Sequence, residues 1–222
     1  MKNVIRALIV LFPWRIKRFL LVKLFHYKIH PTAKIGFSFI YPAFLEMAEN
    51  ATIGSFNVAI HLDKMVIGKN SSIGRCNWIT GFSSNIPSQH FIHDETRKSE
   101  LIIGEESAIT KYHHVDCTNQ IIIGDYVTIA GYYSQFLTHS IDVYEGRQDS
   151  HPIFIEDYCF VGTGVKILGG SKLPAYSVLG AGAGLNKQYE QKWTVYGGVP
   201  AKVIKKLPAT SKYFTREKGF VF

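Results

Sequence analysis

The feature of this sequence that most limits its fold is a period of six residues. Large apolar residues recur at every sixth position, and Gly, which permits a turn, or another small residue often follows. An α-helix would repeat every 3.6 residues and an amphipathic strand every two, whereas a short flat strand followed by a corner fits this pattern. The five registers are Ile29, Ile35, Tyr41, Met47 and Ile53; Ile67, Ile73 and Ile79; Ile103, Ile109 and Val115; Ile123 and Ile129; and Ile155, Val161, Ile167, Leu173, Leu179 and Leu185.

Three strand-and-corner units make one triangular coil of about 18 residues, and coils stacked at a strand spacing of about 4.8 Å form a parallel β-helix. A chain of 222 residues, 46% of them apolar, is long enough for one such core. We therefore predict one all-β domain, a single-stranded parallel β-helix with projecting loops, over residues 29–206. Residues 1–28 form a basic amphipathic helical segment before it, and residues 207–222 a C-terminal tail.

The net charge of +8 is concentrated at the N-terminus. Seven of the 25 Lys and Arg residues and none of the 17 Asp and Glu residues lie in residues 1–28, so the rest of the chain is nearly neutral. The charge therefore does not indicate a nucleic-acid partner. The cations are interleaved with apolar side chains, as in helices that lie on anionic membranes, but a helix that caps the β-helix or packs between subunits fits equally well.

The same segment and the cysteines bear on where the protein works. The apolar run from Ala7 to Phe12 is too short for a membrane-spanning helix, and no small-residue cleavage site follows it, as a signal peptide requires. Three cysteines without a CxxC pair or zinc-ligand spacing favour buried thiols in a reducing compartment. We expect a cytoplasmic protein, with peripheral contact to the inner face of the membrane as an open alternative.

The C-terminal part of the repeat resembles the hexapeptide-repeat acyltransferases, and in particular sugar O-acetyltransferases of the maltose and galactoside type. The resemblance covers residues 29–206 and rests on three segments: Ile155-Glu-Asp-Tyr-Cys-Phe-Val-Gly-Thr-Gly-Val-Lys-Ile-Leu, Leu179-Gly-Ala-Gly-Ala-Gly-Leu and Tyr196-Gly-Gly-Val-Pro-Ala-Lys-Val-Ile. It implies a left-handed coil and a homotrimer with three sites between neighbouring subunits. It also implies acetyl-CoA as the co-substrate, with no metal required.

Two long interruptions of the repeat, within residues 80–102 and 130–154, are polar and rich in titratable side chains. Such segments project as loops from a rigid scaffold, where functional residues concentrate. The second contains His139 directly after Thr138, and the resemblance assigns the catalytic base to a histidine in such a motif. A neutral imidazole with a pKa of about 6.5 can accept the proton of an attacking sugar hydroxyl. Asp142 can orient this imidazole, or make only a local turn.

The resemblance also supplies candidate binding residues. Lysines suit the phosphates of CoA, and Gly-rich corners can offer backbone N–H groups to the cofactor or to the thioester oxygen. The chain departs from common relatives at Asn186-Lys187-Gln188, where many have Thr-Lys-Asp, so the acceptor is the least transferable part. The cofactor candidates are Gly162, Thr163, Ala181, Asn186, Lys187 and Lys202, and the acceptor candidates are His114, Asp116 and Arg147.

Each acceptor candidate has a simpler alternative: a hydrogen-bonded corner for His114 and Asp116, and a solvated loop arginine for Arg147. We expect an enzyme that moves an acetyl group from acetyl-CoA to a sugar hydroxyl, in a cell-surface polysaccharide or its precursor. An N-acetyltransferase acting on an amino sugar would need the same base. A non-catalytic trimeric scaffold at the membrane surface is a further alternative. The γ-type carbonic anhydrases share the fold, but their zinc-binding His-x4-His spacing is missing here.

Overall fold

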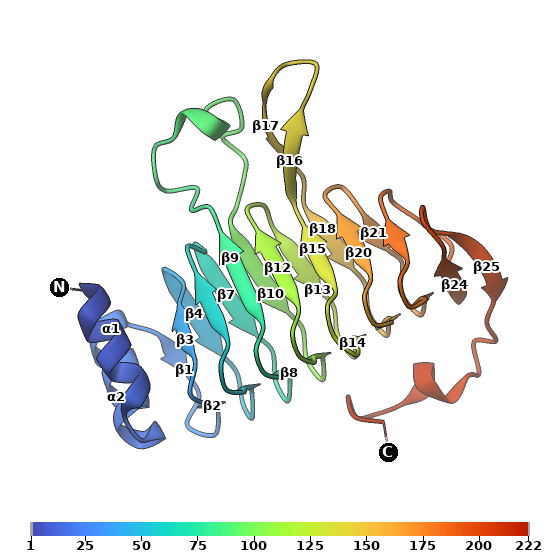
Figure 1. Cartoon of the computed structure of the whole chain (residues 1–222). Helices are drawn as coiled ribbons and strands as arrows, with labels where there is room; N and C mark the ends of the chain where they lie inside the picture. Colours follow the sequence, from blue (N-terminus) through green and yellow to red (C-terminus); the bar gives the residue numbers. More distant parts are fainter. Residues whose placement is uncertain (1, 222) are drawn as a thin grey trace.

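The chain folds into a left-handed parallel β-helix, a triangular prism with two helices at its N-terminal end (Figure 1). The computed structural model describes residues 2–221, with side chains from Val4 onward.

The prism has three sheets, one on each side. The first sheet contains β1 (Lys28–Ile29), β4 (Phe44–Met47), β7 (Lys64–Ile67), β10 (Glu100–Ile103), β13 (Ile121–Ile123), β18 (Ile153–Ile155) and β21 (Lys172–Leu173). The second contains β2 (Lys34–Ile35), β5 (Thr52–Ile53), β8 (Ser72–Ile73), β11 (Ala108–Ile109), β14 (Thr128–Ile129), β19 (Phe160–Val161), β22 (Val178–Leu179), β24 (Thr194–Gly197) and β25 (Lys202–Lys206). The third contains β3 (Phe39–Tyr41), β6 (Val58–Ile60), β9 (Trp78–Gly81), β12 (His114–Cys117), β15 (Gln135–Leu137), β20 (Lys166–Leu168) and β23 (Gly184–Leu185).

The core is a stack of the side chains that the six-residue period places inside the prism. Successive strands of a sheet pair in parallel, so equivalent inward positions lie directly above one another. In the third sheet these positions are at most 2% exposed, and they hold apolar side chains of different sizes that stack in the interior of the prism. The predicted period is therefore confirmed as the origin of the core, but the predicted inward position at Tyr41 is wrong by one residue. Ile40 pairs with Ala59 in the core row, and Tyr41 points to the opposite face, where its hydroxyl donates to the carbonyl oxygen of Arg6 in the first helix. The third-sheet row runs through Ile40, Ala59, Ile79, Val115 and Phe136.

The glycines of the repeat are required by close packing between coils. A Cβ atom on Gly54 would collide with the carbonyl oxygen of Gly74, and one on Gly74 would collide with that of Thr110. Left-handed backbone at the corners is adopted instead by other residues, for example Tyr126 with a φ of 56°. From the sequence, glycine is expected at these positions because it permits turns. The positions are right, but the reason is wrong: glycine is needed because a neighbouring coil leaves no room for a Cβ atom.

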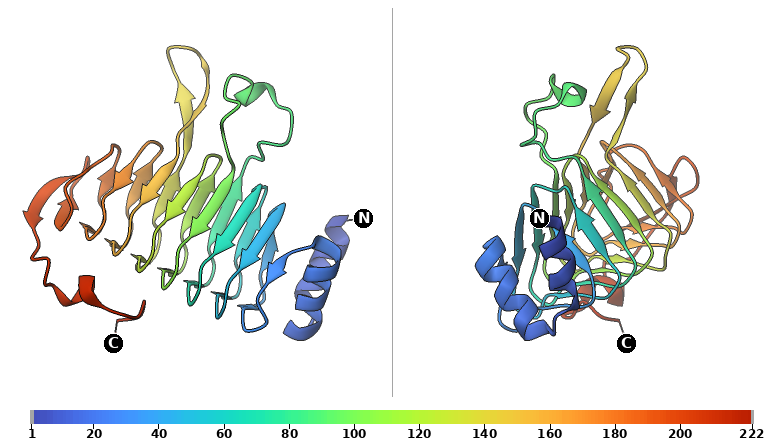
Figure 2. Two further views of the ribbon diagram at one scale, coloured as in Figure 1. Left: turned by 180° about the vertical axis from the view of Figure 1, so that it is seen from behind. Right: turned by 60° about the vertical axis from the view of Figure 1, so that its left-hand side comes forward.

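Two helices close the N-terminal end of the prism (Figure 2). They are α1 (Lys2–Leu11) and α2 (Trp14–Phe25). Leu21 is buried in the core, and the ammonium group of Lys17 donates a hydrogen bond to the carbonyl oxygen of Gly36 at 2.7 Å. Burial lowers the pKa of Lys17 to about 8. Within residues 2–221, neither helix has the length and apolar character that crossing a membrane requires.

The C-terminal tail folds back along the outside of the prism. It contains η2 (Lys212–Thr215), after which the guanidinium group of Arg216 lies over the ring of Tyr158 at 5.5 Å. Further on, the N–H group of Gly219 donates to a carboxylate oxygen of Glu106 at 2.7 Å. The tail thus covers one corner of the prism, where aromatic rings stack from coil to coil at centroid distances of 4.5 to 5.2 Å: Tyr126, Tyr158, Tyr176 and Trp193.

Two projections leave the corner between the third and first sheets (Figures 1 and 2). The first loop, residues 82–99, follows β9 and contains η1 (Gln89–Phe91). The hairpin follows β15 and consists of the antiparallel strands β16 (His139–Asp142) and β17 (Arg147–Ser150). The two interruptions of the repeat therefore do project from the scaffold. They also lie side by side, because η1 packs against β17.

Candidate active site

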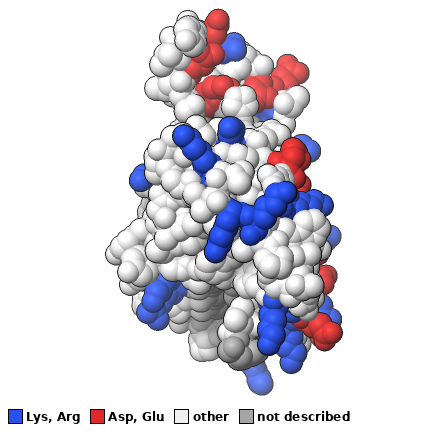
Figure 3. All heavy atoms as spheres, turned by 90° about the vertical axis from the view of Figure 1, so that its right-hand side faces the viewer, with Lys and Arg blue, Asp and Glu red and all other residues white. Residues whose placement is uncertain are grey.

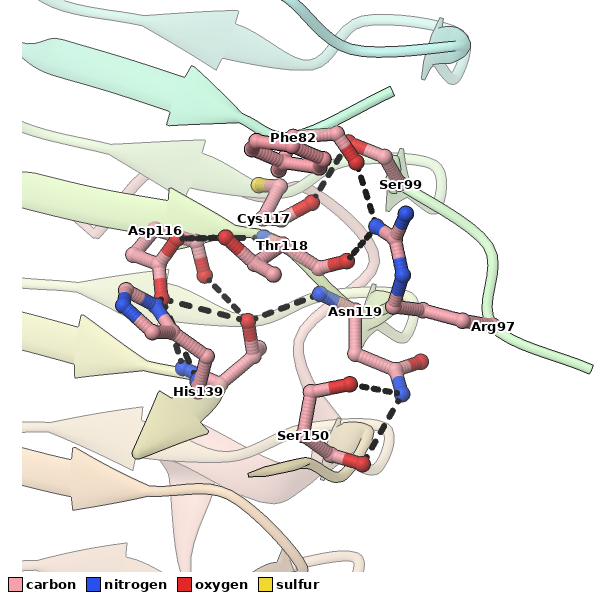
Figure 4. A network of polar contacts seen from close by, with 10 residues as sticks. Phe82, Arg97, Ser99, Asp116, Cys117, Thr118, Asn119, His139 and Ser150 are labelled. Atoms are coloured by element: carbon pink, nitrogen blue, oxygen red, sulfur yellow. Dashed lines mark hydrogen bonds and ion pairs between the residues drawn. The ribbon is translucent and has the colours of Figure 1, made fainter. Parts of the chain in front are cut away.

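The imidazole of His139 and the carboxylate of Asp116 form a hydrogen-bonded pair at the base of the hairpin (Figure 4). The Nδ1 atom of His139 lies 2.7 Å from Oδ2 of Asp116. His139 begins β16, two residues after Leu137, and Leu137 is the register partner of Asp116 on β12 in the preceding coil. The stacking of coils thus brings together two residues that are 23 positions apart in the sequence.

The carboxylate of Asp116 is surrounded by hydrogen-bond donors. Its Oδ1 atom accepts the N–H group and the hydroxyl of Thr118, at 3.1 and 2.7 Å. Its Oδ2 atom accepts the N–H groups of Thr138 and His139, at 3.1 and 3.3 Å, in addition to the imidazole. An ionised carboxylate can only accept, so the imidazole carries its proton on Nδ1 and presents an unprotonated Nε2. Asp116 therefore fixes both the tautomer and the direction of the ring.

The two groups shift each other's pKa toward the charged forms. The hydrogen bond to Asp116 raises the pKa of His139 above its ordinary value, against a smaller opposite effect of burial. Burial alone would raise the pKa of the Asp116 carboxyl, but its hydrogen bonds from His139 and Thr118 outweigh this effect and lower it. The side chain of His139 is 46% exposed, and no group among the described residues hydrogen-bonds to its Nε2 atom. The Nε2 atom of this imidazole is therefore open to a ligand, as a candidate base requires.

Asp142 does not take the orienting role that its spacing from His139 suggests. Its Oδ1 atom accepts the backbone N–H groups of Tyr144 and Glu145, at 2.9 and 3.2 Å, and so closes the tip of the hairpin. Residues 139–142 form a strand, and side chains three positions apart in a strand point to opposite faces. The spacing would suit a helical turn, which this segment does not form. Asp116 occupies the role instead.

A buried arginine connects the first loop to the candidate catalytic pair of His139 and Asp116. Arg97 is 5% exposed, and its guanidinium group donates to the carbonyl oxygens of Phe82 and, at 2.7 Å, of Thr118 (Figure 4). Thr118 is the residue whose N–H and hydroxyl groups hold Oδ1 of Asp116. Arg97 therefore supports the corner from which the carboxylate is positioned, although it does not touch the imidazole.

The start of the first loop is held by a second carboxylate. Asp63 accepts the hydroxyl of Ser83 at 2.5 Å and the N–H groups of Ser84 and Ser99 at 2.9 and 3.2 Å. Burial alone would raise the pKa of Asp63, but the hydrogen bonds from Ser83 and Ser84 outweigh it and lower the pKa. Asp63 precedes β7, one coil before the loop, just as Asp116 lies one coil before the hairpin. Each projection is therefore anchored by a carboxylate of the preceding coil.

From the sequence alone, Asp116 is a candidate for contacting the acceptor, and Arg97 and Thr118 carry no signal of a functional role. The register is what connects them to the site. The pairing of β12 with β15 places Asp116 beside Leu137, and hence next to the first residue of the hairpin. Counting residues along the third sheet, coil by coil, is the signal that can identify such a partner.

Two of the cofactor candidates offer free backbone donors. Thr163 and Ala181 follow β19 and β22 at the same corner on successive coils, about 4.8 Å apart along the axis. Among the described residues their N–H groups donate to no other group. The expectation that Gly162 offers its N–H group to the cofactor is wrong, because that group donates to the carbonyl oxygen of Leu179 at 2.8 Å. This N–H group is already used in the hydrogen bonding between adjacent coils.

Basic side chains gather at the C-terminal end of the prism, while the acidic ones in this view lie mainly on the projections (Figure 3). Asn186 and Lys187 follow β23, and Lys202 begins β25 at this end; all three side chains are exposed. Clustered cations raise the local concentration of anionic ligands such as phosphates. The exposed lysines of this end are Lys187, Lys192, Lys202, Lys205 and Lys206.

The remaining acceptor candidates are separated by the structure. His114 is exposed on β12, two residues before Asp116, so both side chains lie on the outer face of the third sheet. Arg147 instead pairs with Asp142 at the outer end of the hairpin ladder, away from His139. Of the two, only His114 shares a surface with the candidate catalytic pair.

Neither the cysteines nor a metal cluster adds to this site. Cys117 and Cys159 are buried, as expected, and burial raises the pKa of both thiols, while Cys76 is only half-buried. In residues 2–221, no group of three or more His, Cys, Asp or Glu side chains is arranged to hold a metal ion.

Comparison with known proteins places the scaffold. No family model and no curated protein sequence matches this chain. A solved structure does: a hexapeptide-repeat-containing acetyltransferase from Vibrio cholerae is 26% identical, with a TM-score of 0.52 over 64% of this chain and 73% of that chain. This chain has the fold of the hexapeptide-repeat acetyltransferases. The resemblance inferred from the sequence, and the left-handed β-helix that it implies, are thereby confirmed.

Two other solved structures are similar to this chain in fold. The N-acyltransferase AntD from Bacillus cereus, solved with dTDP-4-amino-4,6-dideoxyglucose and coenzyme A, is 16% identical, with a TM-score of 0.57 over 86% of this chain and 89% of that chain. The polysialic acid O-acetyltransferase OatWY is also 16% identical, with a TM-score of 0.53 over 81% of this chain and 84% of that chain. At this identity, both comparisons speak for the fold alone.

Proposed function

We propose that this protein transfers an acetyl group from acetyl-CoA to a sugar hydroxyl, with His139 as the general base. The observation that carries the proposal is the hydrogen-bonded pair of His139 and Asp116, with Nε2 unprotonated and open, on the scaffold of the hexapeptide-repeat acetyltransferases. Acetyl-CoA and coenzyme A accompany other solved proteins of this fold, which supports the same donor here.

The geometry supports a direct transfer without an acyl-enzyme. The Nε2 atom of His139 accepts the proton of the sugar hydroxyl while its oxygen attacks the carbonyl carbon of the thioester. The carbon–sulfur bond then breaks, and the CoA thiolate leaves with the proton returned by the imidazolium. The carboxylate of Asp116 stabilises the imidazolium that forms between these two events.

The donor is proposed to lie along the axis of the prism. The free N–H groups of Thr163 and Ala181 are one and two coils beyond the hairpin, where they can bind amide carbonyls of the pantetheine arm. Lys187 and Lys202 lie further toward the lysine-rich end, where the phosphates of CoA would be stabilised. Thr163 and Ala181 lie at the corner between the second and third sheets, whereas His139 lies at the corner between the third and first sheets. In the expected trimer, a cofactor extended along the first of these corners would meet the imidazole of His139 across a contact between copies, with its phosphates toward the C-terminal end.

We expect three copies to assemble with the catalytic pair near their contacts, as the family resemblance implies. The outer face of the third sheet and its neighbouring corner expose large aromatic side chains, which favours a contact between copies. Light scattering of the purified protein measures this directly, and a monomeric active enzyme would rule out the trimer. These aromatic side chains are Phe56, Trp78, Tyr112 and Tyr133.

The test is CoA release from acetyl-CoA in the presence of a panel of sugar, oligosaccharide and amino-sugar acceptors. We expect turnover with hydroxyl acceptors, and a loss of about 10²-fold or more in kcat for His139→Ala. His151→Ala is the matched control. The side chain of this exposed histidine, at the end of the hairpin, bonds only to Asp149 among the described residues, so the variant should keep full activity.

Other outcomes of the screen would replace the proposal. Turnover confined to amine acceptors would make the protein an N-acetyltransferase with the same base. An active enzyme that is unaffected by His139→Ala would remove the base assignment. The absence of thioester consumption with every acceptor class would favour the non-catalytic scaffold.

A further inference from the structure

The helices at the N-terminal end have two different faces. The inner face is buried, with Leu21 in the core and Lys17 bonded to a carbonyl group of the first coil. The capping alternative from the sequence is therefore realised by one face only. Away from the prism, the helices carry large apolar side chains that are 40% to 66% exposed. We call these the outer cap face: Val4, Ile5, Leu8, Leu11, Phe12, Ile16, Phe19 and Leu24.

The charged side chains of the N-terminal segment that carries the outer cap face are all positive. Residues 1–45 contain no Asp or Glu; the first acidic residue of the chain is Glu46. Some of the cations are used internally, for example Arg18, which donates to the carbonyl oxygen of Ile29 at 2.7 Å. Arg15 and Lys23 remain exposed, and no ion pair within the described part of the chain involves them.

We propose that the outer cap face docks the protein on an anionic lipid surface, with both helices lying in the plane of the membrane. An apolar helix face flanked by cations is suited to this position, because the side chains enter the headgroup region while the cations meet lipid phosphates. With 10 and 12 residues, α1 and α2 are about 15 and 18 Å long, short of the ~30 Å hydrocarbon core. They can therefore lie on the bilayer but not cross it.

Charge favours lipid over a second copy of this chain. A symmetric contact between two outer cap faces would bring identical surfaces together and place the Arg15 and Lys23 groups of both copies near one another. Such like-charge contacts are unfavourable when water is excluded. An anionic bilayer instead offers complementary charge together with an apolar phase for the eight exposed side chains.

Vesicle flotation of the full-length protein tests the proposal. We expect binding to phosphatidylcholine vesicles that contain phosphatidylglycerol, a much weaker binding to phosphatidylcholine alone, and a decrease with added salt. The double substitution Leu8→Ser and Phe19→Ser should weaken binding at least tenfold. Because both side chains are exposed, circular dichroism and acetyl transfer to a soluble acceptor should remain as in the unmodified protein.

A matched control comes from the opposite end of the prism. Ile204 is 61% exposed on β25, and Ile204→Ser should leave flotation unchanged. Arg15→Glu with Lys23→Glu should abolish binding to the anionic vesicles. Equal binding of the unmodified protein and the Leu8/Phe19 variant would overturn the proposal, and so would failure of the unmodified protein to float. A self-associated protein that the same variant dissociates would assign the face to a second copy. The flotation and self-association readouts do not depend on the proposed acetyl transfer, so they stand even if that proposal fails.

Discussion

The first loop and the hairpin leave the same corner of the prism and are anchored in the same way, yet only at the hairpin does the anchoring carboxylate also bind an imidazole. In each case a carboxylate of the preceding coil accepts N–H and hydroxyl groups at the start of the projection. Asp63 is surrounded by serines, whereas Asp116 also receives the imidazole of His139. One added side chain turns a structural anchor into a candidate catalytic pair.

The two projections also differ in their regularity. The hairpin is a four-pair antiparallel ladder whose own backbone bonds set its direction. The first loop has one short η1 turn and depends on Arg97 and Asp63 for its position. Since η1 packs against β17, the irregular loop supports the regular hairpin from the side. Breaking the anchors one at a time separates catalytic from structural roles.

The largest effect is expected from Asp116→Asn. Loss of the negative charge removes the stabilisation of the imidazolium and lets the ring of His139 adopt the wrong tautomer, so kcat should fall on the order of 10²-fold or more. Initial rates of CoA release at saturating acetyl-CoA measure this loss. Asp63→Asn is the matched control: it should lower the free energy of unfolding by about 1–2 kcal/mol and change kcat less than about threefold. Equal activity losses in both variants would mean that the two carboxylates are merely anchors.

Arg97→Ala should lower both the stability of the fold and kcat. Removal of the buried guanidinium leaves carbonyl groups of Phe82 and Thr118 without their donor, and should cost about 2–4 kcal/mol of stability in urea unfolding. The corner that presents Thr118 to Asp116 loosens as well, so we expect roughly a tenfold lower kcat with a nearly unchanged KM for acetyl-CoA. A destabilised variant with full activity would show that the first loop does not support the catalytic pair.

The pH dependence should report the charge of Asp116. His139 acts as a base only when Nε2 is unprotonated, so kcat/KM should rise with pH and level off above the raised pKa of this histidine. In Asp116→Asn the inflection should move to lower pH, because the hydrogen bond and negative charge that raise the pKa of His139 are lost. The contribution of His139 to the free energy of unfolding changes with pH in the opposite direction to kcat/KM. The raised pKa stabilises the fold below the ordinary pKa of histidine, and this contribution is lost as the pH rises through the folded value. If the inflection does not move, the group that titrates in the pH profile is not the imidazole bonded to Asp116.

The smallest effect is expected from Asp142→Asn. Its carboxylate only closes the tip of the hairpin, and an asparagine side-chain oxygen can accept the same N–H groups of Tyr144 and Glu145. Activity should therefore stay within about twofold of the unmodified enzyme. A loss comparable to that of Asp116→Asn would return the orienting role to Asp142.

The fold was predictable because its signal repeats. A residue such as Ile79 is one of many inward positions that obey the same period, and each coil confirms the next. The position of His139 just beyond a strand was equally visible, since the break of the period marks it. The partner of His139 was not, because it depends on the pairing of coils of unequal length. Asp116 is 23 residues away, and no local spacing indicates that distance.

The errors have a common physical origin in the backbone. Asp142 fails as a partner because residues 139–142 are extended, a conformation that the polar sequence of the loop did not reveal. Gly162 fails as a donor because its N–H group belongs to a sheet ladder. Arg97 was missed because its importance lies in burial, and burial of a charged side chain in an irregular loop leaves no pattern in the sequence.

Because each coil adds the same rise along the axis, the number of coils sets the distance between the two ends of the prism. From β1, beside the helical cap, to β13, in the coil that leads to the hairpin, the first sheet advances by four strands, about 19 Å along the axis. With the cap resting on a bilayer, the count of coils would fix the height at which His139 meets an acceptor. Adding one whole coil would raise that height by about 4.8 Å and leave the local geometry intact, so working distance could change in evolution by discrete steps.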